Sequence, residues 1–124
     1  HCGQDDLPVS EVRRIAPHLM VGVSTHSPEQ ALKAVKDGAD YIGVGPIFST
    51  KTKKNVCDAV GFEYLEFAVR DINIPFVAIG GIKEHNIGEV VKRSAKTIAL
   101  VTEIVGAENI KEKIEILNNK LKDK

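Results

Sequence analysis

The sequence predicts an α/β fold in the form of a (β/α) TIM-type barrel, of which the chain supplies the C-terminal half or so. Three observations carry this prediction. Short apolar runs alternate with amphipathic helical segments, and the runs are apolar on both faces, which is typical of a parallel sheet covered by helices. No GxGxxG motif opens a first helix. The polar residues that could bind ligands follow the ends of the strands, where barrel enzymes carry their active sites.

The expected elements form βα pairs along the chain. One helix has clear boundaries, because Ser27 and Gln30 form a capping box, Pro28 suits the first turn and Gly38 ends it. A stripe of Ile and Leu at helical spacing marks the last helix. Strands are expected at residues 19–24, 40–45, 75–81 and 97–102, and helices at 8–16, 27–38, 62–72, 84–94 and 108–122.

A complete barrel has eight strands and typically more than about 200 residues. The sequence provides four complete strands and, just before "GQDD", the tail of a fifth. Residues 1–124 are therefore expected to form the C-terminal portion of one barrel domain, with about four to five βα units of eight. The open edges of such a half-barrel favour a homo-oligomer or an N-terminal half supplied from elsewhere.

Charge and composition limit the class of partner. The chain has 17 acidic and 17 basic residues, no Trp and 5% aromatic residues. This balance provides neither the positive field nor the stacking surface that nucleic acids need. No apolar run approaches the roughly 20 residues that span a bilayer, so no membrane is expected as a partner. Cys2 and Cys57 are far apart and read as free thiols, which is typical of a cytoplasmic protein.

The segment "AIGGI" (78–82) ends a strand in two glycines. Gly80 and Gly81 would let backbone amides approach a phosphate, and Val101 and Thr102 follow the last strand. The two loops thus occupy the usual phosphate position of a barrel. A tight turn that requires glycine is the alternative explanation.

The loop after the strand at 40–45 reads "GPIFSTKTKKN" and is dense in hydroxyls and positive charge. In an extended loop, Thr50 and Thr52 would face one side and Lys51 and Lys53 the other. Directed hydroxyl donors and a compact ammonium group suit a phosphate or a diphosphate. A solvated loop is the alternative, but the position at the carboxyl end of a barrel strand favours binding.

Two further loops carry groups suited to metal or ligand contacts. Asp6 in "GQDD" could hold Mg²⁺ together with substrate phosphates, or it could cap the helix that follows, whereas Asp5 is expected to face solvent. Ser24 in "GVSTHS" could bond a ligand or its own turn. His26 could transfer protons, although a structural role beside a helix cap is the more common one.

These loops, in this order, resemble the C-terminal part of the thiamine-phosphate synthase (thiamine-phosphate pyrophosphorylase) family. The similar segments are "HCGQDDLPV", "GVSTH", "ADYIGVGPIFSTKTKK", "IPFVAIGGI" and "ALVTEI". They extend over nearly the whole chain, but over only the second half or so of a family member. "GPIFSTKTKK" is the most specific of them, whereas "AIGGI" is found in many phosphate-binding barrels.

The resemblance implies a TIM barrel that joins 4-amino-2-methyl-5-pyrimidinylmethyl diphosphate to thiazole phosphate, with Mg²⁺, and releases pyrophosphate in thiamine biosynthesis. It also implies roles for individual residues of this chain. Asp6 would bind Mg²⁺, and Ser24 and Lys53 would hold the pyrimidine diphosphate and act in catalysis. The thiazole phosphate would be bound by Thr50, Thr52, Gly81, Val101 and Thr102.

The sequence also departs from the family pattern. The basic segment near the early barrel strands, the first magnesium aspartate and its neighbouring asparagine are absent, and "SAKTIALVTEI" replaces a glycine-rich turn. Thr102 stands where Ser is usual, and it keeps the hydroxyl. We therefore expect residues 1–124 alone not to catalyse the synthesis. Two alternatives remain: a thiazole tautomerase with His26 in proton transfer, and a phosphate-binding half-barrel without catalysis.

Overall fold

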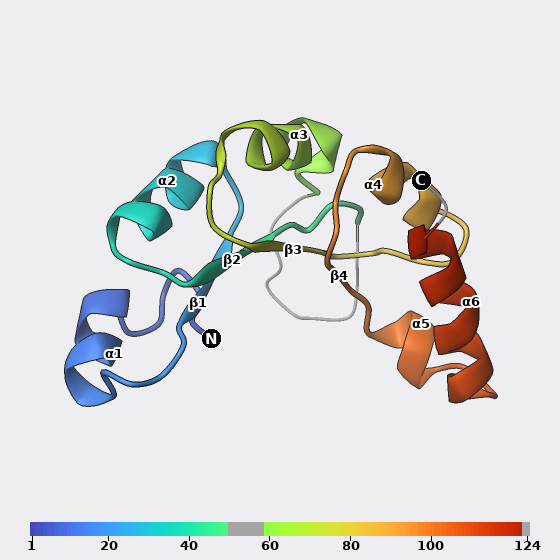
Figure 1. The fold of residues 1–124 in the computed structure, drawn as a ribbon, viewed down its shortest axis with the longest axis horizontal. Coiled ribbons are helices and arrows are strands. Elements are labelled where there is room, and N and C mark those ends of the chain that lie inside the picture. The colour runs from blue at the N-terminus through green and yellow to red at the C-terminus, as the bar shows by residue number, and fades with distance from the viewer. Residues whose placement is uncertain (50–58, 123–124) are drawn as a thin grey trace.

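The computed structural model describes residues 1–49 and 59–122, which form an arc with the helices on the convex side of a sheet (Figure 1). The elements are α1 (Val9–Ile15), β1 (Gly22–Thr25), α2 (Pro28–Lys36), β2 (Tyr41–Val44), α3 (Gly61–Asp71), β3 (Phe76–Ile79), α4 (Ile87–Lys92), β4 (Ile98–Ala99), α5 (Thr102–Val105) and α6 (Ile110–Lys122). The predicted alternation of strands and helices is therefore confirmed.

The strands lie in the order β1-β2-β3-β4, and all three pairings are parallel. At the β1 edge, Cys2 makes a parallel bridge to Val23, and the Ser24 backbone N–H donates to the Cys2 carbonyl at 2.9 Å. This bridge is the end of the fifth strand that the sequence predicts. Sequential order is the order of a barrel, whereas a doubly wound sheet reverses its strand order, so the predicted half-barrel is confirmed.

The helices cover one face of the sheet. In Figure 1, α2, α3 and α4 follow one another along the convex side, while α1 lies at one end of the arc and α6 at the other. Ala78 of β3 is fully buried, but the next residue, Ile79, is 39% exposed because successive side chains point to opposite faces of a strand. Within the described residues, no helix has the length and apolar composition needed to cross a membrane.

The boundaries of α2 follow the predicted capping residues. The Ser27 hydroxyl accepts a hydrogen bond from the Gln30 N–H at 3.3 Å, and Pro28 is the first helical residue. The Gln30 side chain accepts from the His26 N–H at 2.8 Å, one residue before the cap. Gly38 ends the helix with φ 89°, a conformation that residues with a Cβ rarely adopt. This helix fixes the position of the loop that follows β1.

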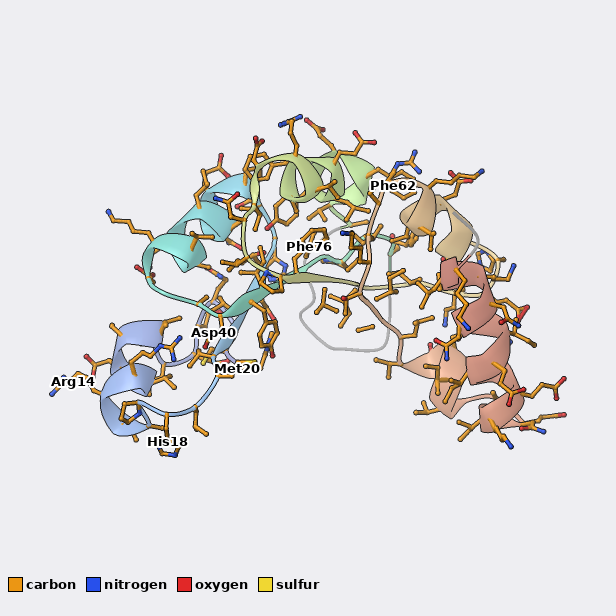
Figure 2. All side chains as sticks on the ribbon, viewed as in Figure 1. Arg14, His18, Met20, Asp40, Phe62 and Phe76 are labelled. Atoms are coloured by element: carbon orange, nitrogen blue, oxygen red, sulfur yellow. The ribbon has the colours of Figure 1, made fainter. Side chains whose placement is uncertain are left out.

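Arg13 of α1 holds the amino ends of two strands. Its guanidinium donates to the Leu19 carbonyl at 2.9 Å, to the Gly38 carbonyl at 2.8 Å and to Asp40 Oδ2 at 2.8 Å. Asp40 Oδ2 also accepts from the Val21 N–H at 2.7 Å. The bond from Val21 and the bond from Arg13 lower the pKa of the Asp40 carboxyl. Figure 2 labels Asp40 where α1 approaches the sheet.

Several predicted boundaries differ from the structure. β1 begins three residues later than expected, and Met20 is 75% exposed, because the chain turns at Leu19, whose carbonyl bonds Arg13. β4 has only two residues, since the Val105 N–H already bonds the Val101 carbonyl and starts the unpredicted α5. The last helix is confirmed. Of its predicted apolar stripe, Leu117 is buried and Leu121 packs against the core, whereas Ile110 and Ile114 are exposed.

Candidate functional site

The loops at the carboxyl ends of the strands contact one another in sequence across the sheet. Four hydrogen bonds link five successive loops. The Gln4 side chain donates to the Ser24 carbonyl at 2.8 Å, and His26 Nδ1 lies 2.7 Å from the Gly45 carbonyl. The Phe48 N–H donates to the Gly80 carbonyl at 3.0 Å, and Lys83 Nζ donates to Thr102 Oγ1 at 2.5 Å. The carboxyl ends of parallel strands share one edge of the sheet. The predicted residues Ser24, Gly81 and Thr102 therefore lie along that edge.

The Ser24 hydroxyl belongs to a short hydrogen-bonded chain that the sequence analysis missed. Ser24 Oγ lies 2.7 Å from His1 Nε2, and His1 Nδ1 lies 3.0 Å from the Tyr41 hydroxyl. The ring of Tyr41 covers Gly22, where a Cβ would lie 2.0 Å from the ring. The alternation of side chains along a strand is the signal that could have shown this contact. Tyr41 pairs with Gly22, and Gly22 lies two residues before Ser24, so Tyr41 and Ser24 share one face of the sheet.

The glycine pair after β3 makes a turn that requires glycine. Gly80 and Gly81 have φ values of 106° and 65°. A Cβ on Gly80 would lie 2.4 Å from Pro46 Cα, and one on Gly81 would lie 2.7 Å from the Ser49 carbonyl oxygen. The turn thus packs directly against the start of the loop that follows β2. The need for a tight turn is established, and phosphate binding by Gly81 stays a prediction.

Thr102 is the first residue of α5, and both Thr102 and Val101 are exposed. Lys83, which the sequence analysis did not single out, donates from Nζ to Thr102 Oγ1 at 2.5 Å. A second bond joins the same two loops, because the Glu84 N–H donates to Glu103 Oε2 at 2.5 Å. The position of Lys83, two residues after a glycine pair at a strand end, was the signal that could have drawn attention to it.

Asp6 is exposed, and its Oδ2 accepts from the Gly3 N–H at 2.6 Å. The alternative role as a helix cap is wrong, since Pro8 occupies the N-cap of α1. Asp6 lines a cavity of about 110 Å³ together with Lys33 of α2 and Asp37, which follows α2.

A magnesium ion needs one or two carboxylates together with phosphate oxygens and water. Among residues 1–49 and 59–122, no three His, Cys, Asp or Glu side chains gather closely enough to hold a metal. The only hydrogen bond of the Asp6 carboxylate within the described residues is the one at Oδ2. Asp6 therefore fits as a single hard-oxygen ligand that other ligands would have to complete.

His26 joins two loops through its ring. Nδ1 lies 2.7 Å from the Gly45 carbonyl, which can only accept, so Nδ1 carries the proton and Nε2 is the acceptor of the neutral ring. The side chain also lines a cavity of about 490 Å³ with Tyr64 and Phe67 of α3. These contacts fit the structural role that the sequence favours, and proton transfer by His26 stays the alternative.

The other predicted contacts, Thr50, Thr52 and Lys53, lie outside the described residues. The structure describes the approach to this segment as far as Ser49, which lies against Gly81.

A sequential parallel sheet with linked loops at its carboxyl edge defines the chain as part of a (β/α) barrel, a fold whose active sites are found at that edge. Comparison with known sequences specifies the family. The sequence profile of the thiamine monophosphate synthase family matches residues 1–104, so the chain belongs to this family.

Individual relatives agree with this assignment. The chain is 67% identical over 118 residues to a thiamine-phosphate synthase of Pelotomaculum thermopropionicum, covering 94% of this chain and 54% of that protein. It is 58% identical over 118 residues to a thiamine-phosphate synthase of Lawsonia intracellularis, with the same coverage of 94% and 54%. The chain thus spans about half the length of the curated relatives it matches.

Solved structures agree as well. A thiamine phosphate pyrophosphorylase from Pyrococcus furiosus superposes with a TM-score of 0.88 at 38% identity, covering 98% of this chain and 58% of that one. A 3-hexulose-6-phosphate synthase superposes with a TM-score of 0.64 at 20% identity, covering 91% and 56%, which supports the fold alone.

Proposed function

We propose that the protein carrying this chain is a thiamine-phosphate synthase. It would join 4-amino-2-methyl-5-pyrimidinylmethyl diphosphate to thiazole phosphate and release pyrophosphate. The observation that supports this most strongly is the continuous contact of the carboxyl-edge loops, which groups Ser24, Gly81 and Thr102 on one edge of the sheet. Family membership and the names of the most similar relatives support the same reaction.

The proposed thiazole-phosphate subsite consists of the turn after β3 and the start of α5. Gly81 has no Cβ, so a phosphate can approach its backbone, and the exposed Thr102 hydroxyl supplies a directed donor beside it. Thr50 and Thr52 would complete this subsite from the neighbouring loop. The described part of that loop, Pro46 to Ser49, already packs against the glycine pair.

The proposed diphosphate subsite includes the Ser24 hydroxyl and the Lys53 ammonium. Bond breaking between the pyrimidinylmethyl carbon and the diphosphate oxygen leaves positive charge on the pyrimidine and negative charge on the diphosphate. The thiazole nitrogen then supplies the electron pair of the new carbon–nitrogen bond. Hydrogen-bond donors and positive charge held at the leaving group lower the barrier, and this is usually the largest catalytic effect.

Mg²⁺, held by Asp6 together with the diphosphate oxygens, would neutralise charge on the leaving group when bound. The residues of this chain have two tasks in that arrangement. The Gly3 N–H orients the Asp6 carboxylate, and His1 orients the Ser24 hydroxyl. The reaction needs no covalent intermediate with the protein.

The test is formation of thiamine phosphate by the purified full-length protein that carries this chain, with both substrates and Mg²⁺. We expect turnover, and we expect Ser24→Ala and Thr102→Val each to reduce kcat/KM by about tenfold or more, the scale of one hydrogen bond to a charged group. Thr97→Val is the matched control, since Thr97 is an exposed threonine at the opposite end of β4. Absence of turnover in the unmodified protein would refute the proposed function.

A further inference from the structure

We propose that Lys83 is a specificity residue of this site that selects the phosphorylated form of the thiazole substrate. This inference rests on the proposed function. Lys83 is half-buried and lies in the loop after β3, and its Nζ contacts Thr102 Oγ1 of the neighbouring loop at 2.5 Å. The charge is thus placed beside the hydroxyl that we assign to the phosphate.

The acidic residues that directly follow Lys83 and Thr102 in the sequence do not pair with Lys83. Glu84 pairs with Lys113 of α6 at 3.2 Å, and Glu103 accepts from the Glu84 N–H. None of the ion pairs formed within the described residues involves Lys83. An ammonium group next to a hydroxyl, with the neighbouring carboxylates engaged elsewhere, suits an anionic ligand.

The direction of the contact determines what the pair can offer. An ammonium group has donors only, so Lys83 donates and Thr102 Oγ1 accepts. The hydroxyl hydrogen of Thr102 must then point away from Lys83, and two N–H groups of Lys83 remain. The pair therefore presents several donors and one positive charge, which matches a phosphate dianion and matches a neutral alcohol poorly.

The backbone at Lys83 is held in place by Asn86. The Lys83 N–H donates to Asn86 Oδ1 at 2.7 Å, and Asn86 Nδ2 donates to the Gly81 carbonyl at 3.1 Å. The Ile87 N–H donates to the Lys83 carbonyl at 2.8 Å. These bonds connect the backbone of Lys83 to the glycine turn. The side chain of Lys83 therefore extends from a backbone position that is fixed within the proposed subsite.

A purely structural link between the two loops is the competing explanation. It predicts that loss of Lys83 weakens the binding of every ligand of this edge and lowers stability. Recognition of the phosphate predicts a loss confined to phosphorylated ligands. The comparison of thiazole phosphate with the unphosphorylated thiazole alcohol therefore separates the two explanations.

The experiment is calorimetric titration of the native protein with both ligands, using Lys83→Met, Lys83→Gln and Lys96→Met. Lys96 is an exposed lysine just before β4, at the other end of the sheet. We expect both Lys83 variants to bind thiazole phosphate about tenfold or more weakly and the alcohol unchanged, as for a lost hydrogen bond to a charged group. Lys96→Met should match the unmodified protein.

The Gln variant keeps a donor for Thr102 without the charge, so it tests the charge even where the Met variant fails to fold. Equal weakening of both ligands, or unchanged binding of thiazole phosphate, would overturn the role of Lys83. The proposed function is judged separately by the turnover of the unmodified protein. Turnover with no phosphate-selective loss refutes the Lys83 inference alone, whereas a phosphate-selective loss without turnover refutes the synthase function alone.

Discussion

The hydroxyl groups of Tyr64 and Thr25 lie 2.5 Å apart in the buried layer between α3 and the sheet. Thr25 donates its hydrogen to the Gly43 carbonyl at 2.7 Å, so Tyr64 must donate to Thr25. One phenol therefore connects α3 to the end of β1 and, through Thr25, to β2. The contact lies directly under the edge that carries the proposed site.

We expect Tyr64→Phe to lower the free energy of unfolding by about 0.5–1.5 kcal/mol, the usual net value of a hydrogen bond. Burial raises the pKa of the Tyr64 phenol, and the bond with Thr25 offsets part of this increase. A raised pKa means that the contribution is complete below about pH 10 and is lost as the pH rises further. Urea unfolding of both proteins between about pH 8 and pH 11 measures this. A difference that stays constant over the whole range would contradict the assignment.

Asp40 should make stability depend on acid. Its pKa is lowered in the folded state, mainly by the bond from the Val21 N–H and then by Arg13. The contribution is therefore present above about pH 4 and is lost as the pH falls through the folded pKa. We expect Asp40→Asn to flatten the acid limb of the stability profile, measured by thermal unfolding at several pH values. Asp37→Asn, at an exposed pair with Lys33, is the control and should have the smaller effect.

Gly81 and Gly88 should respond in opposite ways to alanine. At Gly81, φ is 65° and the new Cβ would lie 2.7 Å from the Ser49 carbonyl oxygen, so Gly81→Ala should destabilise by about 1–2 kcal/mol or more. At Gly88 in α4 a Cβ meets nothing within 4 Å, and Gly88→Ala should be neutral or stabilising by up to about 1 kcal/mol. Denaturant midpoints compare them. Equal effects would mean that the glycine turn is not strained.

Asn86 should affect both stability and ligand affinity. Asn86→Ala removes two hydrogen bonds that hold the turn, one to the Lys83 N–H and one to the Gly81 carbonyl, so we expect a loss of about 1–3 kcal/mol and a higher KM for thiazole phosphate. Asn109→Ala is the control, because the Asn109 side chain accepts from the Glu112 N–H at the start of α6, away from the glycine turn. It should lower stability and leave KM unchanged. An unchanged KM in both variants would mean that the glycine turn takes no part in binding the phosphate.

His26 tests the tautomerase alternative. Asparagine can donate from about the position of Nδ1, so His26→Asn should keep the bond to the Gly45 carbonyl and leave the synthase rate within a few-fold of normal. His26→Ala should lower stability, because the bond between the two loops is lost. Steady-state kinetics and thermal unfolding of both variants provide the readout. A large loss of rate in His26→Asn at normal stability would indicate proton transfer by the imidazole.

The sequence predicted the elements with strong local signals. Ser27, Pro28 and Gly38 fixed the ends of α2 because capping and positive φ are properties of a few adjacent residues. The start of β1 and the short α5 were missed. The Leu19 carbonyl is taken by Arg13, six residues away, and α5 begins at Thr102, the last residue of the segment that was expected to be a strand. Such choices depend on contacts that local patterns do not encode.

The residues of the candidate site divide in the same way, into those with a local sequence signal and those without one. Gly81 and Thr102 could be proposed from the sequence because glycines and hydroxyls at strand ends have few uses, and their contact with a phosphate stays a prediction. Lys83 and His1 were missed because their significance comes from partners 19 and 23 residues away. For Asp6 the local pattern left two roles open, a magnesium ligand and a helix cap, and the structure excludes the cap because Pro8 is the N-cap of α1.

The three bonds of Arg13 secure the amino ends of β1 and β2, while Ser24, Gly81 and Thr102 lie at or just after the carboxyl ends of their strands. The contacts that stabilise the fold and the residues assigned to ligand binding therefore lie at opposite ends of the same strands, and the sheet connects them. Substitutions that retune ligand preference can accumulate in the loops without touching the anchor. A change of substrate would therefore require substitutions only in the loops at the carboxyl ends of the strands, with the Arg13 contacts at the amino ends kept.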